Sequence, residues 1–392
     1  MPEPSKMRDL RLDFFRGVAL IFIFIDHIPE NILSYFTLQA VGFYDAAEVF
    51  IFISGFTAAL VYGQRLAAKG ALYATAQIWH RAWQLYVAHV FLFVIFIGEV
   101  SYTVMTFNNP MYNEEMRVAD FLIHPHIAVM KALLLEFQPT FLDILPLYIL
   151  MMVLFPAILL GIQRRPLLML AASLALYLAV QIFGLSVSAY PEGSTWYFNP
   201  LAWQFLFVAG AVLGQISARG QISARGHALP SLTRSLMPFA LTVLAVAMII
   251  RLSWTIAGVW SAVPALLLKE LWPVDKTDLS PIRLVPFLAS VVLVAFWVRP
   301  DAWYLQTRWA RPFVVCGRQS LEVFCIGIVL SALGHFILSS YRSGLVMQVA
   351  VNVVGIGAML LTARMIDWYK AMDRVSREVI APPPGRGDEA PL

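Results

Sequence analysis

Charged residues and cysteines are both scarce in this chain of 392 residues. Only 13% of the residues are Asp, Glu, Lys or Arg, whereas 60% are hydrophobic, and the mean hydropathy is +0.73. Such a composition excludes an ordinary soluble domain. The two cysteines, Cys316 and Cys325, lie in or beside a hydrophobic run, which favours buried thiols over a disulfide or a metal pair. The formal net charge of +4 says little about nucleic acid, and no nucleic-acid partner is expected.

Long apolar runs are abundant, and many are long enough to cross the hydrocarbon core of a bilayer. Ten such runs cover residues 12–29, 46–63, 83–104, 140–162, 166–186, 199–216, 237–257, 282–298, 318–340 and 345–367. The sequence therefore predicts an all-α, polytopic integral membrane bundle of about ten transmembrane helices. Residues 1–380 are expected to form a single domain, and residues 381–392 have the composition of a disordered tail.

The positions of lysine and arginine predict how the chain is oriented in the membrane. When the ten runs are threaded alternately, 21 of the 28 Lys and Arg residues lie on the side of the N-terminus. Cytoplasmic loops carry the excess of these residues, so both termini are predicted to be cytoplasmic. The first run is not expected to be a cleaved signal peptide, because it carries Arg16, Asp26 and His27 and no small-residue cleavage site follows it.

Arg16 and His27 lie inside the first predicted span. A charge near the bilayer centre costs ~2.5–3.5 kcal/mol on insertion scales, so such residues usually face the protein interior and have a function. Eleven helical steps of ~100° place both side chains on one face, with a rise of ~16 Å between them. The predicted orientation puts His27 in the outer half of the membrane. This pattern indicates a reaction coordinated across the bilayer.

Polar residues also interrupt other predicted spans or lie at their edges. They are Asp45, Glu48 and Ser54 in the second, Glu136, Gln138 and Asp143 at the fourth, Asn199, Trp203 and Gln204 at the sixth, Asp275, Lys276, Asp278 and Arg283 at the eighth, and Arg318, Ser320 and Glu322 at the ninth. Polar groups at membrane depth mark functional sites or pair helices with one another. Ser54 is followed by glycine, which favours close helix packing over catalysis.

Six segments carry a family resemblance: RLDFFRGVAL, EVFIFISGFTAAL, EFQPTFLDILPLY, FNPLAWQFLF, DKTDLSPIR and GRQSLEVF, in this order from the first span to the ninth. They resemble the OpgC proteins, succinyltransferases of osmoregulated periplasmic glucans within the broad acyltransferase family 3. The mark of the broad family is a basic residue and a histidine with ten residues between them, here Arg16 and His27. The resemblance implies about ten transmembrane helices in the bacterial inner membrane.

The same resemblance implies the substrates. The donor is acyl-CoA in the cytoplasm, expected to be succinyl-CoA, with no bound cofactor, and the acceptor is a hydroxyl of a periplasmic glucan. Membrane lipid and glucan-synthesis proteins are the further partners expected. A transporter that exports a glucan or an acylated precursor is the alternative, but the sequence lacks the two repeated halves that transporters often show. A scaffold for glucan synthesis is a third reading, and it predicts no need for His27.

Acyl transfer to a sugar hydroxyl needs a base, and histidine is the usual general base near neutral pH. His27 is therefore the predicted base. Asp26 adjoins it, but neighbours on a helix point ~100° apart, so Glu48 is an equally good candidate to orient the imidazole. In the alternative interpretation, a backbone carbonyl in the bundle simply satisfies His27.

Three residues are predicted to bind the donor. The guanidinium of Arg16 suits a CoA phosphate, with Asp13 as its orienting partner, and Arg318 is the third member. Asp13 and Arg16 lie three residues apart on one helix, so a purely structural ion pair is the alternative.

The predicted substrate-binding residues lie in the later spans. A succinyl group is anionic, and a buried unpaired charge is costly, so a cation is expected close to His27. Lys276 and Arg283 are the candidates, with Arg283 favoured for its bidentate geometry. Pairing with Asp275 and Asp278 is the alternative. The carboxylates Asp143 and Glu322 and the aromatic Trp203 complete the set, and Trp203 stacks on a sugar or anchors the membrane interface.

No metal site is expected. His124 and His126 form an H-x-H pattern with Glu114 and Glu115 upstream, but solvated loop histidines are common. Three further segments stand out: 127–137 as an interfacial amphipathic helix, 258–281 as a stretch that re-enters the membrane or lies on it, and 215–226 as a tandem QISARG repeat with no assigned role.

Overall fold

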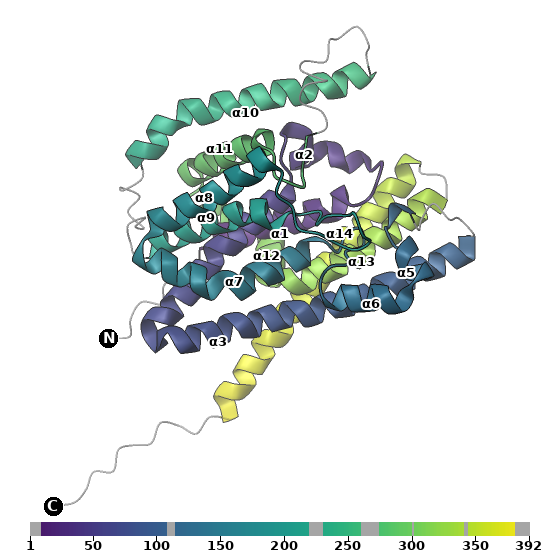
Figure 1. Ribbon diagram of the computed structural model, residues 1–392, viewed down its shortest axis with the longest axis horizontal. Coiled ribbons are helices and arrows are strands. Elements are labelled where there is room, and N and C mark those ends of the chain that lie inside the picture. Colours follow the sequence, from purple (N-terminus) through teal and green to yellow (C-terminus); the bar gives the residue numbers. More distant parts are fainter. Residues whose placement is uncertain are drawn as a thin grey trace, which may run out of the picture.

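The computed structural model describes residues 9–107, 114–218, 230–259, 274–299, 302–340 and 344–380. Within these ranges the chain forms helices and loops, and no β-strand is present. The helices lie side by side in a bundle, and most of their axes are roughly aligned with one another (Figure 1). The predicted all-α class is therefore confirmed.

The long helices share one feature, a mostly apolar sequence that favours burial or contact with lipid. They are α1 (Leu10–Asp26), α3 (Ala46–Phe107), α7 (Ile144–Arg164), α8 (Pro166–Phe183), α9 (Pro200–Ala218), α10 (Pro230–Val259), α11 (Pro281–Trp297), α13 (Ser320–Ser340) and α14 (Leu345–Ile380). The short helices are η1 (Ile32–Phe36), α2 (Leu38–Val41), α5 (Ala119–Ile123), α6 (Pro125–Leu133), η2 (Trp303–Gln306) and α12 (Arg311–Arg318).

Helix α3 consists of two arms joined at Gly70. That glycine has a φ of 82°, a conformation that costs glycine little and other residues more. Arg65 Nη1 donates a hydrogen bond of 2.9 Å to Gln77 Oε1, although residues twelve apart on a straight helix would be separated by ~18 Å. The chain therefore folds back, and residues 46–69 form a first arm and residues 71–107 a second arm. These arms correspond to the second and third predicted spans.

Seven helices among the described residues are long and apolar enough to cross a membrane. One of these seven is α3, whose two arms are counted together as one helix. Helices α1 and α11 are not among the seven, because each has only 17 residues. Each of the ten predicted runs overlaps a described helix or an arm of α3. The chain is thus a multi-pass membrane protein, while the total of ten crossings and the cytoplasmic termini stay predictions.

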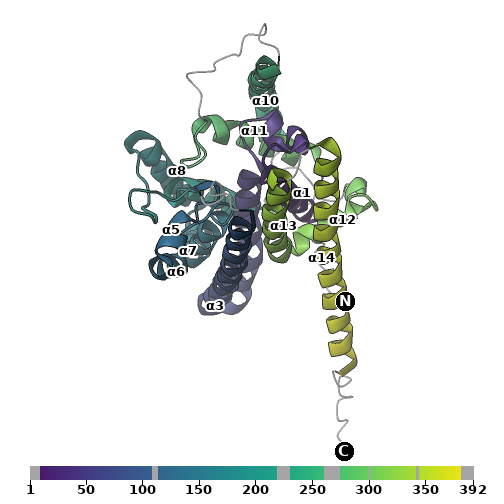
Figure 2. The same cartoon turned by 90° about the vertical axis from the view of Figure 1, so that its right-hand side faces the viewer.

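Several predicted features lie at the edges of the described chain. The helix predicted at 127–137 forms in part, because α6 begins at Pro125 and ends at Leu133, four residues before the predicted end. Residues 260–273 of the stretch predicted to re-enter the membrane, residues 219–226 of the QISARG repeat and the 381–392 tail lie outside the described residues. Helix α14 is much longer than one crossing requires, and its last turns project from the bundle (Figure 1, Figure 2).

Helix α1 lies in the interior of the bundle and packs against the first arm of α3, α12 and α13 (Figure 2). Glycines make its contact with α12 unusually close. A Cβ added to Gly17 would lie 1.9 Å from Phe313 O, and one added to Gly317 would lie 1.8 Å from Asp13 O. The two backbones thus touch directly, as small residues allow in membrane bundles.

Close packing also joins α3 to α9. A Cβ on Gly55 would lie 2.0 Å from Phe207 O, and Ser54 beside it is buried. This confirms the predicted packing role of the Ser54–Gly55 pair. We call the end of the bundle that holds His27 and the start of α7 the outer end, and the end that holds Gly70 the inner end. Helix α10 lies to one side, against α11 (Figure 1).

Candidate active site

His27 caps the C-terminal end of α1, at the outer end of the bundle. Its Nδ1 lies 2.6 Å from the backbone oxygen of Ile23. A carbonyl oxygen only accepts hydrogen bonds, so Nδ1 carries the proton and the lone pair of the neutral ring is on Nε2. Phe141 packs edge-on against the imidazole, with 4.6 Å between the ring centroids. The ring is therefore held by α1 and by the segment before α7, in the tautomer that a general base needs.

Asp26 does not orient the imidazole, contrary to one of the two predicted alternatives. Its Oδ1 accepts hydrogen bonds from Thr37 Oγ1 at 2.7 Å and from Gln39 Nε2 at 2.9 Å. The carboxylate thus faces the 37–39 turn, as the ~100° offset between helix neighbours anticipates. Its other oxygen, Oδ2, is buried without a hydrogen-bond partner among the described residues. Within the described chain, Asp26 Oδ2 is therefore an unpaired hydrogen-bond acceptor on the residue that precedes His27.

Glu48 does not contact His27 either. Arg283 donates to Glu48 Oε1 from Nε at 2.8 Å and from Nη2 at 2.6 Å, and the backbone N–H of Asp45 donates to Oε2 at 3.0 Å. These bonds occupy both oxygens of a carboxylate that is fully buried. The backbone carbonyl of Ile23 orients the imidazole instead, so the expected role of Glu48 toward His27 is corrected.

Four charged residues form one cluster beside this site, which we call the ion quartet: Asp45, Glu48, Lys276 and Arg283. Asp45 Oδ2 pairs with Lys276 Nζ at 2.7 Å and with Arg283 Nη2 at 3.0 Å. Two carboxylates thus face two cations, which is how buried charges are tolerated. The quartet joins the start of α3, the start of α11 and the loop at 274–280.

Pairing within the ion quartet keeps Asp45 and Lys276 ionised. Burial alone would raise the pKa of Asp45, but Lys276 and Arg283 hold it well below its usual range. Burial would likewise lower the pKa of Lys276, but Asp45 raises it above its usual range. Both residues are therefore charged at neutral pH.

Trp203 fixes the loop that carries Lys276. Its indole N–H donates to Lys276 O at 3.0 Å and to Thr277 O at 3.1 Å, and the backbone N–H of Asn199 donates to Thr277 O at 3.0 Å. The side chain of Trp203 is fully buried, so it has no free face on which a sugar could stack. The predicted stacking role is wrong, and Trp203 is a positioning residue for the loop.

The outer loops meet around Tyr197. Arg117 lies 5.5 Å from the centroid of this ring and Lys276 lies 6.0 Å from it, so the ring attracts two cations. Lys276 is also within electrostatic range of Asp26, His27 and Asp143. The structure thus brings the predicted residues Asp26, His27, Glu48, Asp143, Lys276 and Arg283 together at the outer end.

The three predicted donor residues lie together in the inner half. Arg16 Nη2 donates to Thr57 Oγ1 at 2.6 Å, which points it at the first arm of α3. Arg318 Nε lies 3.7 Å from Asp13 Oδ2 across the close contact between α1 and α12. Since Arg16 is ~16 Å from His27 along the helix, the two groups of polar residues are separate sites on one element.

Glu322, predicted as a substrate-binding carboxylate or a helix-pairing group, lies apart from the outer group. It pairs with Lys370 Nζ at 3.1 Å, and its side chain is 42% exposed. The register of α13 is set by Ser331, whose hydroxyl donates to Phe24 O, so Glu322 lies ~14 Å further toward the inner end. Its ion pair joins α13 to α14, which is the helix-pairing alternative.

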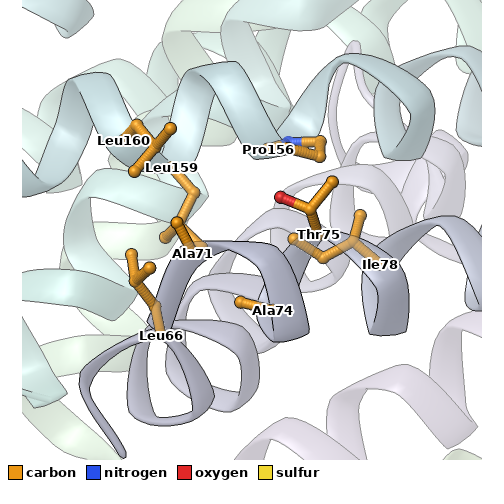
Figure 3. A pocket seen from close by; sticks show the side chains of 8 residues that line it. All are labelled: Leu66, Ala71, Ala74, Thr75, Ile78, Pro156, Leu159 and Leu160. Atoms are coloured by element: carbon orange, nitrogen blue, oxygen red, sulfur yellow. The ribbon is translucent and has the colours of Figure 1, made fainter. Parts of the chain in front are cut away.

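Arg81 is a candidate that sequence reasoning missed. It lines a narrow cleft between both arms of α3, α7 and α13, together with Phe50, Leu85, Leu145, Tyr148, Ser320, Leu321 and Phe324. The sequence presents Arg81 only as one of many cytoplasmic-side cations, and its position becomes informative once the fold-back at Gly70 is known. A second cleft, between the α3 turn and α7, is lined by apolar residues and Thr75 (Figure 3). It offers no charged group.

Comparison with known proteins identifies the family. A family model described as OpgC protein matches residues 8–371, a range that contains every candidate site residue from Asp13 to Glu322. No curated protein and no solved structure matches the chain.

Proposed function

Because this chain belongs to the OpgC protein family, we propose that it is an O-acyltransferase of the bacterial inner membrane. It moves a succinyl group from succinyl-CoA in the cytoplasm to hydroxyls of periplasmic glucans. The family match supports glucan modification by acyl transfer, and the seven apolar helices support a multi-pass membrane protein. The residues at the outer end support His27 as the general base.

The observation that carries this proposal is the state of His27. Its Nδ1–H is committed to Ile23 O, so the lone pair on Nε2 is available to accept a proton. In the transfer, Nε2 takes the proton of a glucan hydroxyl, and the hydroxyl oxygen forms a bond to the thioester carbonyl carbon. The carbon–sulfur bond then breaks, and the departing thiolate of coenzyme A takes the proton from the imidazolium. The products are a glucan ester and free coenzyme A.

The donor enters from the inner end in this mechanism. Arg16 and Arg318 meet the phosphates of coenzyme A, for which guanidinium groups are well suited, and Asp13 orients Arg318. The pantetheine arm then covers the ~16 Å along α1 that separates Arg16 from the base.

The acceptor enters from the outer end. The carboxylates of Asp26 and Asp143 are the acceptors proposed for sugar hydroxyls, and Asp26 Oδ2, next to His27 in the chain, is buried without a hydrogen-bond partner among the described residues. The ion quartet holds the surrounding elements in place. Neither Asp26 nor Asp143 is required to move a proton.

The test measures transfer in detergent, where purified protein, labelled succinyl-CoA and glucan share one compartment. Wild-type protein should form succinylated glucan, and His27→Ala should reduce it to background while the protein remains folded and membrane-inserted. His124→Ala, which changes an exposed loop histidine, is the matched control and should retain activity. Because an exporter without chemistry would produce no ester in detergent, a silent wild type would reject the enzyme. Full activity of His27→Ala would reject the proposed base.

A further inference from the structure

Arg283 is the sequence-based candidate for reading an anionic acyl group, but the structure commits it elsewhere. Its Nε and Nη2 both donate to Glu48, and Nη2 also pairs with Asp45. Its side chain is only 10% exposed. Removing these bonds to receive a substrate would leave the fully buried Glu48 carboxylate without its cation, which is costly. Arg283 is thus a partner of the protein's own carboxylates.

Lys276 differs from Arg283 in what it has left to offer. An ammonium group has three donors, and among the described residues a single carboxylate oxygen, Asp45 Oδ2, receives one of them at 2.7 Å. The side chain is 27% exposed. Its Nζ lies over the rings of Phe198 and Tyr197, at 5.4 and 6.0 Å from the centroids, and both rings attract the ammonium group. Lys276 can therefore receive a second anion without leaving Asp45.

The position of Lys276 is fixed by the backbone around it. The indole of Trp203 holds the carbonyls of Lys276 and Thr277, and Asn199 holds Thr277 from the other side. The lysine is a preorganised cation, since its loop does not have to be ordered when substrate arrives. It is also within electrostatic range of His27.

Burial makes such a cation necessary. The side chain of Lys276 is 27% exposed and lies against the rings of Phe198 and Tyr197, so an anion bound to it is largely removed from water. An unpaired charge in such a place is costly, and an acyl group with a free carboxylate therefore needs a cation beside it. A neutral acyl group does not.

We infer that Lys276 binds the free carboxylate of a dicarboxylic acyl group, and so makes this site selective for succinyl over neutral acyl groups of the same length. The inference rests on the proposed acyl transfer. The carboxylate lies two methylene groups beyond the reacting carbonyl, so its cation must act close to the base, and Lys276 acts electrostatically on His27. The contact is a charge-assisted hydrogen bond in a partly desolvated site, shared with Asp45 through the same ammonium.

The experiment compares two donors that differ only in charge, succinyl-CoA and butyryl-CoA, with purified protein and glucan in detergent. Lys276→Met removes the charge and keeps most of the chain length. It should lower kcat/KM for succinyl-CoA at least about tenfold and change butyryl-CoA by less than about twofold, since a hydrogen bond to a charged group is lost for one donor only. Lys276→Arg, which keeps the cation, should retain the preference for succinyl. Lys131→Met is the matched control, because this outer-side lysine pairs with Glu136 away from His27.

Each outcome is decisive. Equal loss with both donors, or no loss with succinyl-CoA, overturns the role of Lys276 while leaving acyl transfer intact. Wild-type protein that uses butyryl-CoA but not succinyl-CoA has the same consequence. Wild-type protein that uses neither donor refutes the proposed function, and the inference with it. If Lys276→Met does not accumulate in membranes, Lys276→Gln repeats the comparison with a shorter polar side chain.

Discussion

At the scale of single residues, the candidate site combines a histidine that is held by the backbone with charged side chains that are held by one another. Histidine in a hydrophobic bundle has two nitrogens to satisfy, and here the protein satisfies one of them with Ile23 O. The contact gives the ring a fixed tautomer. A histidine satisfied by a backbone carbonyl, which is the alternative interpretation of His27, can therefore also be a catalytic base. A bond from a carboxylate is not needed to position the ring.

The pairing of Arg283 with Glu48 yields the first prediction. Arg283→Met should lower the stability of the folded protein by about 3–5 kcal/mol, because it leaves Glu48 buried without a counter-ion. Glu48→Gln in the Arg283→Met background should recover much of this loss, since the buried charge is then gone. Thermal unfolding of the detergent-solubilised single and double variants measures both effects. A double variant less stable than Arg283→Met would show that the pair is not what stabilises this region.

Arg16 yields the second prediction. Arg16→Ala should raise the KM for succinyl-CoA while the KM for glucan changes by less than about twofold, because Arg16 lies on the inner side of α1, far from the acceptor. Arg165→Ala is the control, since Arg165 is an exposed inner-side arginine at the end of α7. A variant whose glucan KM rises and whose donor KM stays constant would contradict the assignment of Arg16 to the donor.

At the scale of elements, the contact between α1 and α12 connects packing to the donor site. Gly17 and Gly317 bring the two backbones together, and the same contact places Arg318 beside Asp13. Amphipathic α12 is therefore part of the site, although it is only eight residues long.

The third prediction concerns this contact. Gly317→Ala places a methyl group where Asp13 O now lies, and overpacking of this kind costs about 1–3 kcal/mol. We expect a lower unfolding temperature and a higher KM for succinyl-CoA together. Gly357→Ala on α14 is the matched control, because nothing lies within 4 Å of its added Cβ. It should be neutral or slightly stabilising, and identical behaviour of the two variants would refute the role of the close contact.

Element positions could be predicted from the sequence far better than contacts between elements. Apolar runs located every long helix, because bilayer thickness sets a length that hydropathy reveals. The partners of Arg283 could not be found in this way, since Glu48 is 235 positions away in the chain and only the fold brings them together. Trp203 was misassigned because an aromatic at the start of an apolar run looks the same whether it faces lipid, sugar or a backbone carbonyl. The partner of Glu322 could not be predicted either, since Lys370 is 48 positions away in the chain.

At the scale of the whole molecule, the two polar groups divide the protein into an inner half and an outer half. Asp13, Arg16 and Arg318 occupy the inner half, and His27 with the ion quartet occupies the outer end. Because α1 carries members of both groups, a rigid helix fixes the distance between Arg16, the proposed donor residue, and His27, the proposed base. The arrangement suits substrates that arrive from opposite sides of the membrane.

The last prediction tests this sidedness. Of the 28 Lys and Arg residues, 21 lie on the side of the N-terminus when the predicted spans alternate, so that side should face the cytoplasm. Sealed, right-side-out vesicles supplied with glucan outside should form succinylated glucan only when succinyl-CoA is loaded inside. Inverted vesicles should form succinylated glucan only when succinyl-CoA is outside and glucan is inside. In detergent, transfer should continue without any requirement for sidedness, because detergent removes the barrier and leaves the catalytic residues in place. Equal transfer from succinyl-CoA on either side of sealed vesicles would mean that Arg16 and Arg318 do not define a cytoplasmic entrance for the donor.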